Sequence, residues 1–139
     1  MILPLPEKYW NNPSQAYGVL DWETYPQTGR HIGVDFPCPV GTPITALADC
    51  TLNQVGSSDA LGHWCEVKID DWYMVCLHLK GQPLQLDYKQ GDTIGYTGGS
   101  GKIQGVHSHI EGWVNPMDRS MLTKANWMNL TFDITKKIK

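Results

Sequence analysis

The sequence lacks the long apolar runs and the charge bias that would place it in a membrane or on nucleic acid. Nowhere among its 139 residues do roughly 18 apolar residues follow one another, so no transmembrane helix is predicted. Its 11 Lys and Arg residues nearly balance 14 Asp and Glu residues, and the net charge is −3. This leaves no basic surface for a polyanion. We therefore expect neither membrane insertion nor nucleic-acid binding.

The N-terminus has none of the features of a secretory signal. The opening MILPLPEKYWNN contains no basic n-region, no apolar core and no small-residue cleavage site. The sequence therefore predicts synthesis in the cytoplasm without a signal peptide.

Cysteine pairs of the C-x-x-C type are also missing, which argues against a zinc ribbon or a thioredoxin-like motif. In a reducing compartment the four cysteines are interpreted as small buried hydrophobes; they are Cys38, Cys50, Cys65 and Cys76. A contact between Cys65 and Cys76 across a hairpin is left open.

Phenylalanine is scarce, with two residues, but six Trp, six Tyr, 14 Gly and nine Pro are present. Such turn formers favour many short elements. Runs rich in β-branched and aromatic residues predict strands at 44–55, 63–70, 72–79, 93–97 and 107–114. The Asp70-Asp71 pair predicts a tight hairpin turn, and a short helix is expected around residues 121–128. The prediction is a mainly β, single-domain antiparallel sheet with minor helix.

Residues 1–30 differ in composition from the rest of the chain. They are rich in Pro, Asn, Tyr and Trp and show little periodicity. We expect them to form an irregular N-terminal arm that packs on a domain made of residues 31–139.

Four of the five histidines stand in patterns that favour a common site. His107 and His109 lie two residues apart in an expected strand, so both imidazoles share one face, together with Glu111. His31 and Asp35 are four residues apart in a segment whose glycine and prolines argue against a helix. On extended chain this spacing again places both groups on one side.

The fourth histidine, His78, ends the expected strand 72–79. Strict alternation would place His78 on the face of Met74 and Cys76, opposite Val75, Leu77 and Leu79.

Two imidazoles and a carboxylate with one open position recur as the ligand set of catalytic zinc. The open position activates a water molecule at neutral pH. Each short pattern is weak alone, because H-x-H is frequent by chance. The prediction of a metal site depends on the order of four features along the chain. They are H-x-x-x-D, a strand that ends in His-Leu, a Gly-rich turn and H-x-H. No G-x-S-x-G or H-E-x-x-H motif competes with it.

Five segments together resemble the LytM/lysostaphin family of zinc metallopeptidases, over roughly residues 29–114. They are GRHIGVDF (29–36), GTPITA (41–46), CLHL (76–79), QGDTIG (90–95) and GVHSHIE (105–111). Ser108 and Ile110 depart from the usual Leu and Phe of the last motif. The resemblance implies the family's sheet, built from a duplicated hybrid motif.

The same resemblance implies that His31, Asp35 and His109 bind one Zn²⁺ ion and that His78 and His107 are the catalytic histidines. The implied activity is that of a zinc metalloendopeptidase which hydrolyses peptide cross-links of bacterial peptidoglycan. The bond could be Gly–Gly or D-Ala–diaminopimelate, and the oligomeric state stays open.

A chain with neither a leader nor a wall-binding module predicts a phage lysin or a virion-associated lytic protein that acts on the bacterial cell wall. The alternative is an inactive wall-binding or tail structural module of the same fold. A third interpretation, from residues 88–95, is a lipoyl or biotinyl carrier. Such carriers need an exposed lysine at a hairpin tip, and the sequence offers none.

Overall fold

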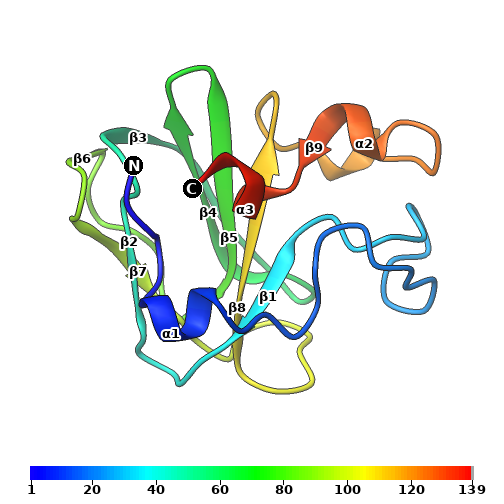
Figure 1. Ribbon diagram of the computed structural model, residues 1–139, viewed down its shortest axis with the longest axis horizontal. Coiled ribbons are helices and arrows are strands. Elements are labelled where there is room, and N and C mark those ends of the chain that lie inside the picture. Colours follow the sequence, from blue (N-terminus) through cyan, green and yellow to red (C-terminus); the bar gives the residue numbers. More distant parts are fainter. Residues whose placement is uncertain (139) are drawn as a thin grey trace.

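An antiparallel sheet is the main element of the computed structural model, which describes residues 1–138 (Figure 1). Its strand order is β1-β8-β5-β4-β3-β6, and β9 pairs with β8. The strands are β1 (Val34–Pro37), β3 (Cys50–Ser58), β4 (Gly62–Ile69), β5 (Trp72–Leu79), β6 (Asp87–Tyr88), β8 (His107–Trp113) and β9 (Thr131–Phe132). A separate two-stranded sheet joins β2 (Pro43–Thr45) to β7 (Thr93–Tyr96). The predicted mainly β, antiparallel fold is confirmed.

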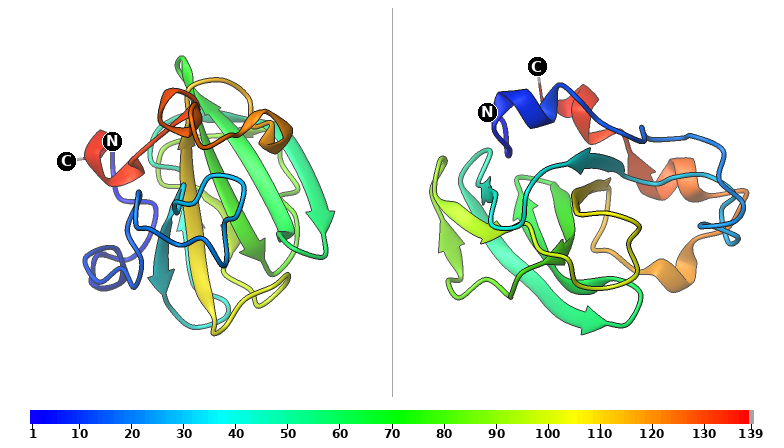
Figure 2. Two further views of the ribbon diagram at one scale, coloured as in Figure 1. Left: turned by 90° about the vertical axis from the view of Figure 1, so that its right-hand side faces the viewer. Right: turned by 90° about the horizontal axis from the view of Figure 1, so that it is seen from below.

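The helices are single turns that lie beside the sheet (Figure 2). They are α1 (Glu7–Trp10), the 3₁₀ turn η1 (Arg119–Met121), α2 (Trp127–Leu130) and α3 (Ile134–Lys137). The helix expected around residues 121–128 is therefore wrong as one element, because a turn separates η1 from α2. No helix within residues 1–138 is long and apolar enough to cross a bilayer.

The strand expected at 44–55 is two strands in different sheets. The chain leaves β2 after Thr45 and enters the large sheet at Cys50. Between them, Ala46 and Leu47 are both completely buried, which breaks the alternation of a strand with one solvated face. The hairpin predicted at Asp70-Asp71 is confirmed, since Ile69 pairs with Trp72 across it.

The large sheet buries side chains on both faces. One cluster contains Met74, Cys76 and Ile110, and the other contains Val75, Leu77 and Trp113. Because successive residues of a strand point to opposite faces, the second cluster shares its face with His109 and Glu111. The functional site is built on this second face.

All four cysteines are buried free thiols, as expected. Cys65 of β4 lies directly opposite Cys76 of β5, so the two thiols do face each other across the hairpin.

The N-terminal arm runs along the edge strand β1 (Figure 1). Trp10 stacks on Phe36 with ring centroids 4.7 Å apart, and Gln15 forms a bridge to Asp35. These contacts place the arm against the strand that carries Asp35.

Candidate functional site

The pairing of β1 with β8 brings the first members of the site together. Asp35 lies directly opposite His109, and Pro37 lies opposite His107. His31 precedes β1, where its backbone bonds to Gly18 and Val19 of the arm. Residues that are about 75 positions apart in sequence thus converge because two strands are in register.

Asp35 is the centre of the cluster. Its Oδ1 lies 2.7 Å from His109 Nδ1, 3.4 Å from His31 Nε2 and 3.3 Å from His107 Nε2. His31 Nε2 and His109 Nδ1 are 3.3 Å apart. One ligand atom from each of His31, Asp35 and His109 lies within 4.8 Å of the others, so these three residues could hold a metal ion.

The hydrogen bonds around the cluster fit a bound cation. His31 Nδ1 lies 3.2 Å from the Ala16 carbonyl, and His109 Nε2 lies 2.7 Å from a Glu111 oxygen. Carbonyl and carboxylate oxygens only accept, so both nitrogens carry the proton and donate. The opposite nitrogens face the Asp35 carboxylate and carry lone pairs in the neutral imidazoles. Atoms this rich in electrons lie so close together only with positive charge between them, which a proton or a metal cation can supply.

The pKa values show the same preference for positive charge. Burial opposes the protonation of His109, but hydrogen bonds to Asp35 and Glu111 raise its pKa to about 9. Burial likewise opposes ionisation of Asp35, yet the hydrogen bonds from His107, His109 and His31 hold its pKa far below the usual range.

His78 does not follow the predicted alternation, and the sequence-based face assignment is wrong. Its φ of +59° lies in the left-handed region, which a residue other than glycine seldom adopts. This twist lets Leu79 join the cluster of Met74 and Cys76, while His78 turns to the face of His109. Strained residues of this kind are frequent at functional sites.

His78 and His107 are oriented in the same way. His78 donates Nδ1–H to the Ser100 carbonyl at 2.9 Å, and His107 donates Nδ1–H to the Gly105 carbonyl at 2.9 Å. The centroids of the two rings are 5.3 Å apart. His78 therefore keeps its Nε2 as a free acceptor, whereas His107 directs its Nε2 toward Asp35 Oδ1, 3.3 Å away. Burial, followed by the nearby His109, lowers the pKa of His78 to about 4, so His78 is neutral at pH 7.

A groove of about 600 Å³ opens above these residues. One wall comes from the arm and the other from the loop after β7; the lining residues are Ser14, Gln15, Asp21, Thr24 and Tyr25 on one side and Gly101 to Gln104 on the other. Asp35, His78 and His107 line the groove between them. The sequence predicts pocket walls from the N-terminal arm, residues 98–105 and residues 57–63; the first two contribute to the groove and the third does not line it. Which arm residues line it could not be predicted, because residues 14–25 have no periodicity.

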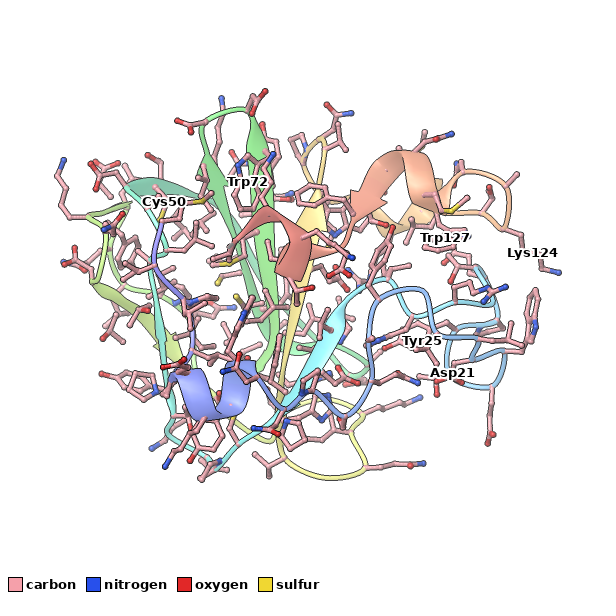
Figure 3. All side chains as sticks on the ribbon, in the orientation of Figure 1. Asp21, Tyr25, Cys50, Trp72, Lys124 and Trp127 are labelled. Carbon is pink, nitrogen blue, oxygen red and sulfur yellow. The ribbon has the colours of Figure 1, made fainter. Side chains whose placement is uncertain are left out.

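Tyr25 packs its ring 5.1 Å from the ring of His31. Figure 3 shows Tyr25 and Asp21 on the same loop of the arm. Burial, followed by the charge of Asp35, raises the pKa of the Tyr25 hydroxyl well above its ordinary value, so Tyr25 stays a neutral donor beside the groove.

All five residues singled out in the sequence lie together. Two imidazoles and one carboxylate converge on one point, and two further imidazoles stand beside them at an open groove. Such a site is typical of enzymes that use a metal ion to activate water. The chain belongs to Peptidase family M23, whose model matches residues 29–120.

Individual relatives agree with this family. The chain is 33% identical to peptidoglycan DD-endopeptidase ShyC from Vibrio cholerae serotype O1 over 105 residues. This alignment covers 71% of this chain and 24% of ShyC. The catalytic domain of the antimicrobial peptidase lysostaphin from Staphylococcus simulans superposes with a TM-score of 0.77 at 22% identity, covering 96% of this chain and 97% of that domain.

A zinc-containing peptidase from Vibrio cholerae superposes with a TM-score of 0.73 at 20% identity, covering 94% of this chain and 37% of that one. At these identities the two structures establish the fold. The chain spans about a quarter of the length of ShyC.

Proposed function

We propose that this chain is a zinc-dependent endopeptidase that hydrolyses peptide cross-links of bacterial peptidoglycan. The observation that carries the proposal is the convergence of His31 Nε2, Asp35 Oδ1 and His109 Nδ1 beside the imidazoles of His78 and His107 in one open groove. Membership of family M23 and the names of the relatives support it.

Zinc is the metal that suits this donor set. It accepts nitrogen and oxygen ligands together and is commonly bound by three protein groups with one position left open. We assign His31, Asp35 and His109 as those groups. When bound there, zinc supplies a Lewis acid that polarises a peptide carbonyl and lowers the pKa of water.

His78 and His107 perform the proton transfers in this proposal. Each holds its ring by an Nδ1–H bond to a backbone carbonyl, which leaves its Nε2 to act at the site. One imidazole takes the proton of the attacking water. That proton then passes from the same imidazole to the leaving amine, while the other imidazole, in its protonated form, donates an Nε2–H hydrogen bond to the oxyanion.

Peptidoglycan is proposed as the substrate because ShyC is named a peptidoglycan DD-endopeptidase and lysostaphin an antimicrobial peptidase. The groove of about 600 Å³ leaves space for a peptide beside His78 and His107. Membrane or nucleic-acid binding has no part in the proposal.

The direct test uses two purified walls, one cross-linked through diaminopimelate and one through pentaglycine. New amino groups are counted without additions, with a chelator, and with the chelator followed by excess zinc. The proposal is supported if amine release stops with the chelator and returns with zinc. The wall that is cut faster then identifies the type of bond that the enzyme hydrolyses. A folded, zinc-loaded protein that releases no amine from either wall contradicts it.

The same experiment separates the enzyme from the inactive wall-binding or tail module. Such a module would sediment with the walls but release no amine in any condition. The role as a phage lysin or virion-associated protein stays a prediction from the sequence. Its test is mass spectrometry of purified virions from the source, together with lysis of host cells on expression with a holin.

A further inference from the structure

Glu111 is completely buried behind His109, and its carboxylate is saturated with hydrogen bonds. Its Oε1 accepts from Trp113 Nε1 at 2.8 Å and from Arg119 Nη1 at 3.0 Å. Its Oε2 accepts from His109 Nε2 at 2.7 Å and from Arg119 Nη2. Each oxygen accepts two hydrogen bonds, which fills the four lone-pair positions of the carboxylate.

Arg119 reaches Glu111 through both guanidinium nitrogens of its fork. This two-point contact fixes the plane of the carboxylate as well as its position. Burial opposes ionisation of Glu111, but the positive charge of Arg119 followed by the His109 bond holds its pKa well below the usual range. Arg119 is not among the residues that line the groove.

The backbone around Arg119 is held on two sides. Met117 N, two residues earlier, donates to the buried carboxylate of Glu66. Glu66, Val75 and Glu111 form one row across β4, β5 and β8, since each is the register partner of the next. On the other side, Gln27 of the arm donates to the carbonyls of Arg119 at 3.0 Å and Leu122 at 2.7 Å.

We infer that Arg119 is a positioning residue of the metal site, acting through Glu111 to fix the ring of His109 with Nδ1 toward Asp35. The inference rests on the proposed role of His109 as a metal ligand. Arg119 itself does not line the groove, so its role is indirect.

The physical basis is the short chain Arg119–Glu111–His109. Glu111 fixes the direction of the His109 N–H as long as the plane of its own carboxylate is fixed. Without the guanidinium, one buried oxygen keeps only the Trp113 bond and the other only the His109 bond. The carboxylate can then rotate and the His109 ring with it. A lysine at position 119 would keep the charge but make a single-point contact.

The test compares Arg119→Gln and Arg119→Lys with the wild-type protein. Lys124→Gln is the matched control, because Lys124 is an exposed cation of the same C-terminal stretch and lies over Trp22, away from Glu111. For each protein we would measure the zinc dissociation constant by competition with a chromophoric chelator and the visible absorption spectrum after Co²⁺ substitution. Thermal unfolding of the metal-free proteins reports on folding.

We expect Arg119→Gln to weaken zinc binding about 10–100-fold, the range for groups that orient a metal ligand. Its Co²⁺ spectrum should change in shape, since the ligand geometry changes. Arg119→Lys should fall between Arg119→Gln and wild type, and Lys124→Gln should match wild type in both readouts.

The inference is overturned if Arg119→Gln keeps the wild-type zinc affinity and the wild-type Co²⁺ spectrum. This holds even if its melting temperature falls, because Arg119 would then be purely structural. That result leaves the proposed function intact provided that wild-type protein binds one zinc and His109→Ala does not. A wild-type protein that binds no zinc would instead contradict the proposed function. If Arg119→Gln does not fold, the decision rests on Arg119→Lys, for which a wild-type spectrum and affinity would equally overturn it.

Discussion

Gly33 packs directly against the His109 ring: a Cβ at Gly33 would lie 2.6 Å from His109 Nε2 and 2.9 Å from Glu111 Cγ. Both contacts are closer than real Cβ atoms approach. The absence of a side chain at position 33 therefore makes room for the hydrogen bond between His109 and Glu111. This gives a physical reason for glycine between His31 and Asp35.

Replacing Gly33 with alanine should disturb the metal site and the core together. Overpacking of this kind costs about 1–3 kcal/mol of the unfolding free energy. We also expect weaker zinc binding, because the His109 ring must shift. Urea unfolding and chelator competition measure the two effects. Gly81→Ala is the control, since a Cβ at Gly81 meets nothing within 4 Å; equal zinc affinity in both variants would contradict the prediction.

His109→Ala and His78→Ala should separate metal binding from turnover. His109 supplies one of the three converging ligand atoms, so its loss should abolish zinc binding and activity together. His78 lies beside the cluster without belonging to it, so His78→Ala should retain zinc while kcat falls about 10²–10⁴-fold. Metal analysis of the dialysed proteins and the wall assay provide the readouts. Wild-type turnover in His78→Ala would disprove its catalytic role.

The metal-free protein should lose stability in mildly acidic solution through His78. Burial first, and then the nearby His109 and His107, lower the pKa of His78 from 6.5 to about 4, while the Ser100 and Asp35 contacts oppose this shift. A base with a lowered folded-state pKa contributes stability above pH 6.5, and this contribution disappears as the pH falls toward 4.

The measurement is the unfolding free energy of chelator-treated protein at several pH values between about 4 and 7. His78→Gln should show a shallower decline than wild type, because the other titrating groups are common to both proteins. Parallel curves for the two proteins would contradict the assignment.

The four thiols should be unreactive in the native protein. All are buried, and the thiolate is the reactive form. Burial raises the pKa of Cys50 to about 11, and the hydrogen bond with Cys65 followed by burial raises that of Cys76. With a disulfide reagent at pH 8, four equivalents should react rapidly in guanidinium chloride and none rapidly without it. Fast native labelling at two or more sites would show that the core is open.

That the five residues lie together was expected from the order of their motifs and the family resemblance, and part of this arrangement follows from strand geometry alone. His107 and His109 share a face of a strand, and the strand register brings Asp35 opposite His109. The face of His78 could not be predicted, since its positive φ is imposed where the strand ends and the chain turns into the next loop. Histidine as a residue type does not predict a positive φ at this position.

Arg119 and Tyr25 could not be predicted for a different reason. Arg119 is eight residues after Glu111 in sequence, in a segment without periodicity, and its position depends on the Glu66 and Gln27 contacts. Tyr25 likewise reaches His31 only after the arm has folded back along β1. Such contacts arise from tertiary packing of irregular chain, for which spacing rules carry no information.

The arm has a consequence for the solubility of the protein as well as for the groove. β1 is at the end of the strand order, and the arm occupies its free edge through the bonds Ser14 N to Asp35 O and Asp35 N to Gln15 O, each 2.9 Å long. An uncovered edge strand offers its backbone to strands of other molecules. A fragment trimmed to residues 29–120, the region that the family model matches, would expose this edge and should self-associate through it.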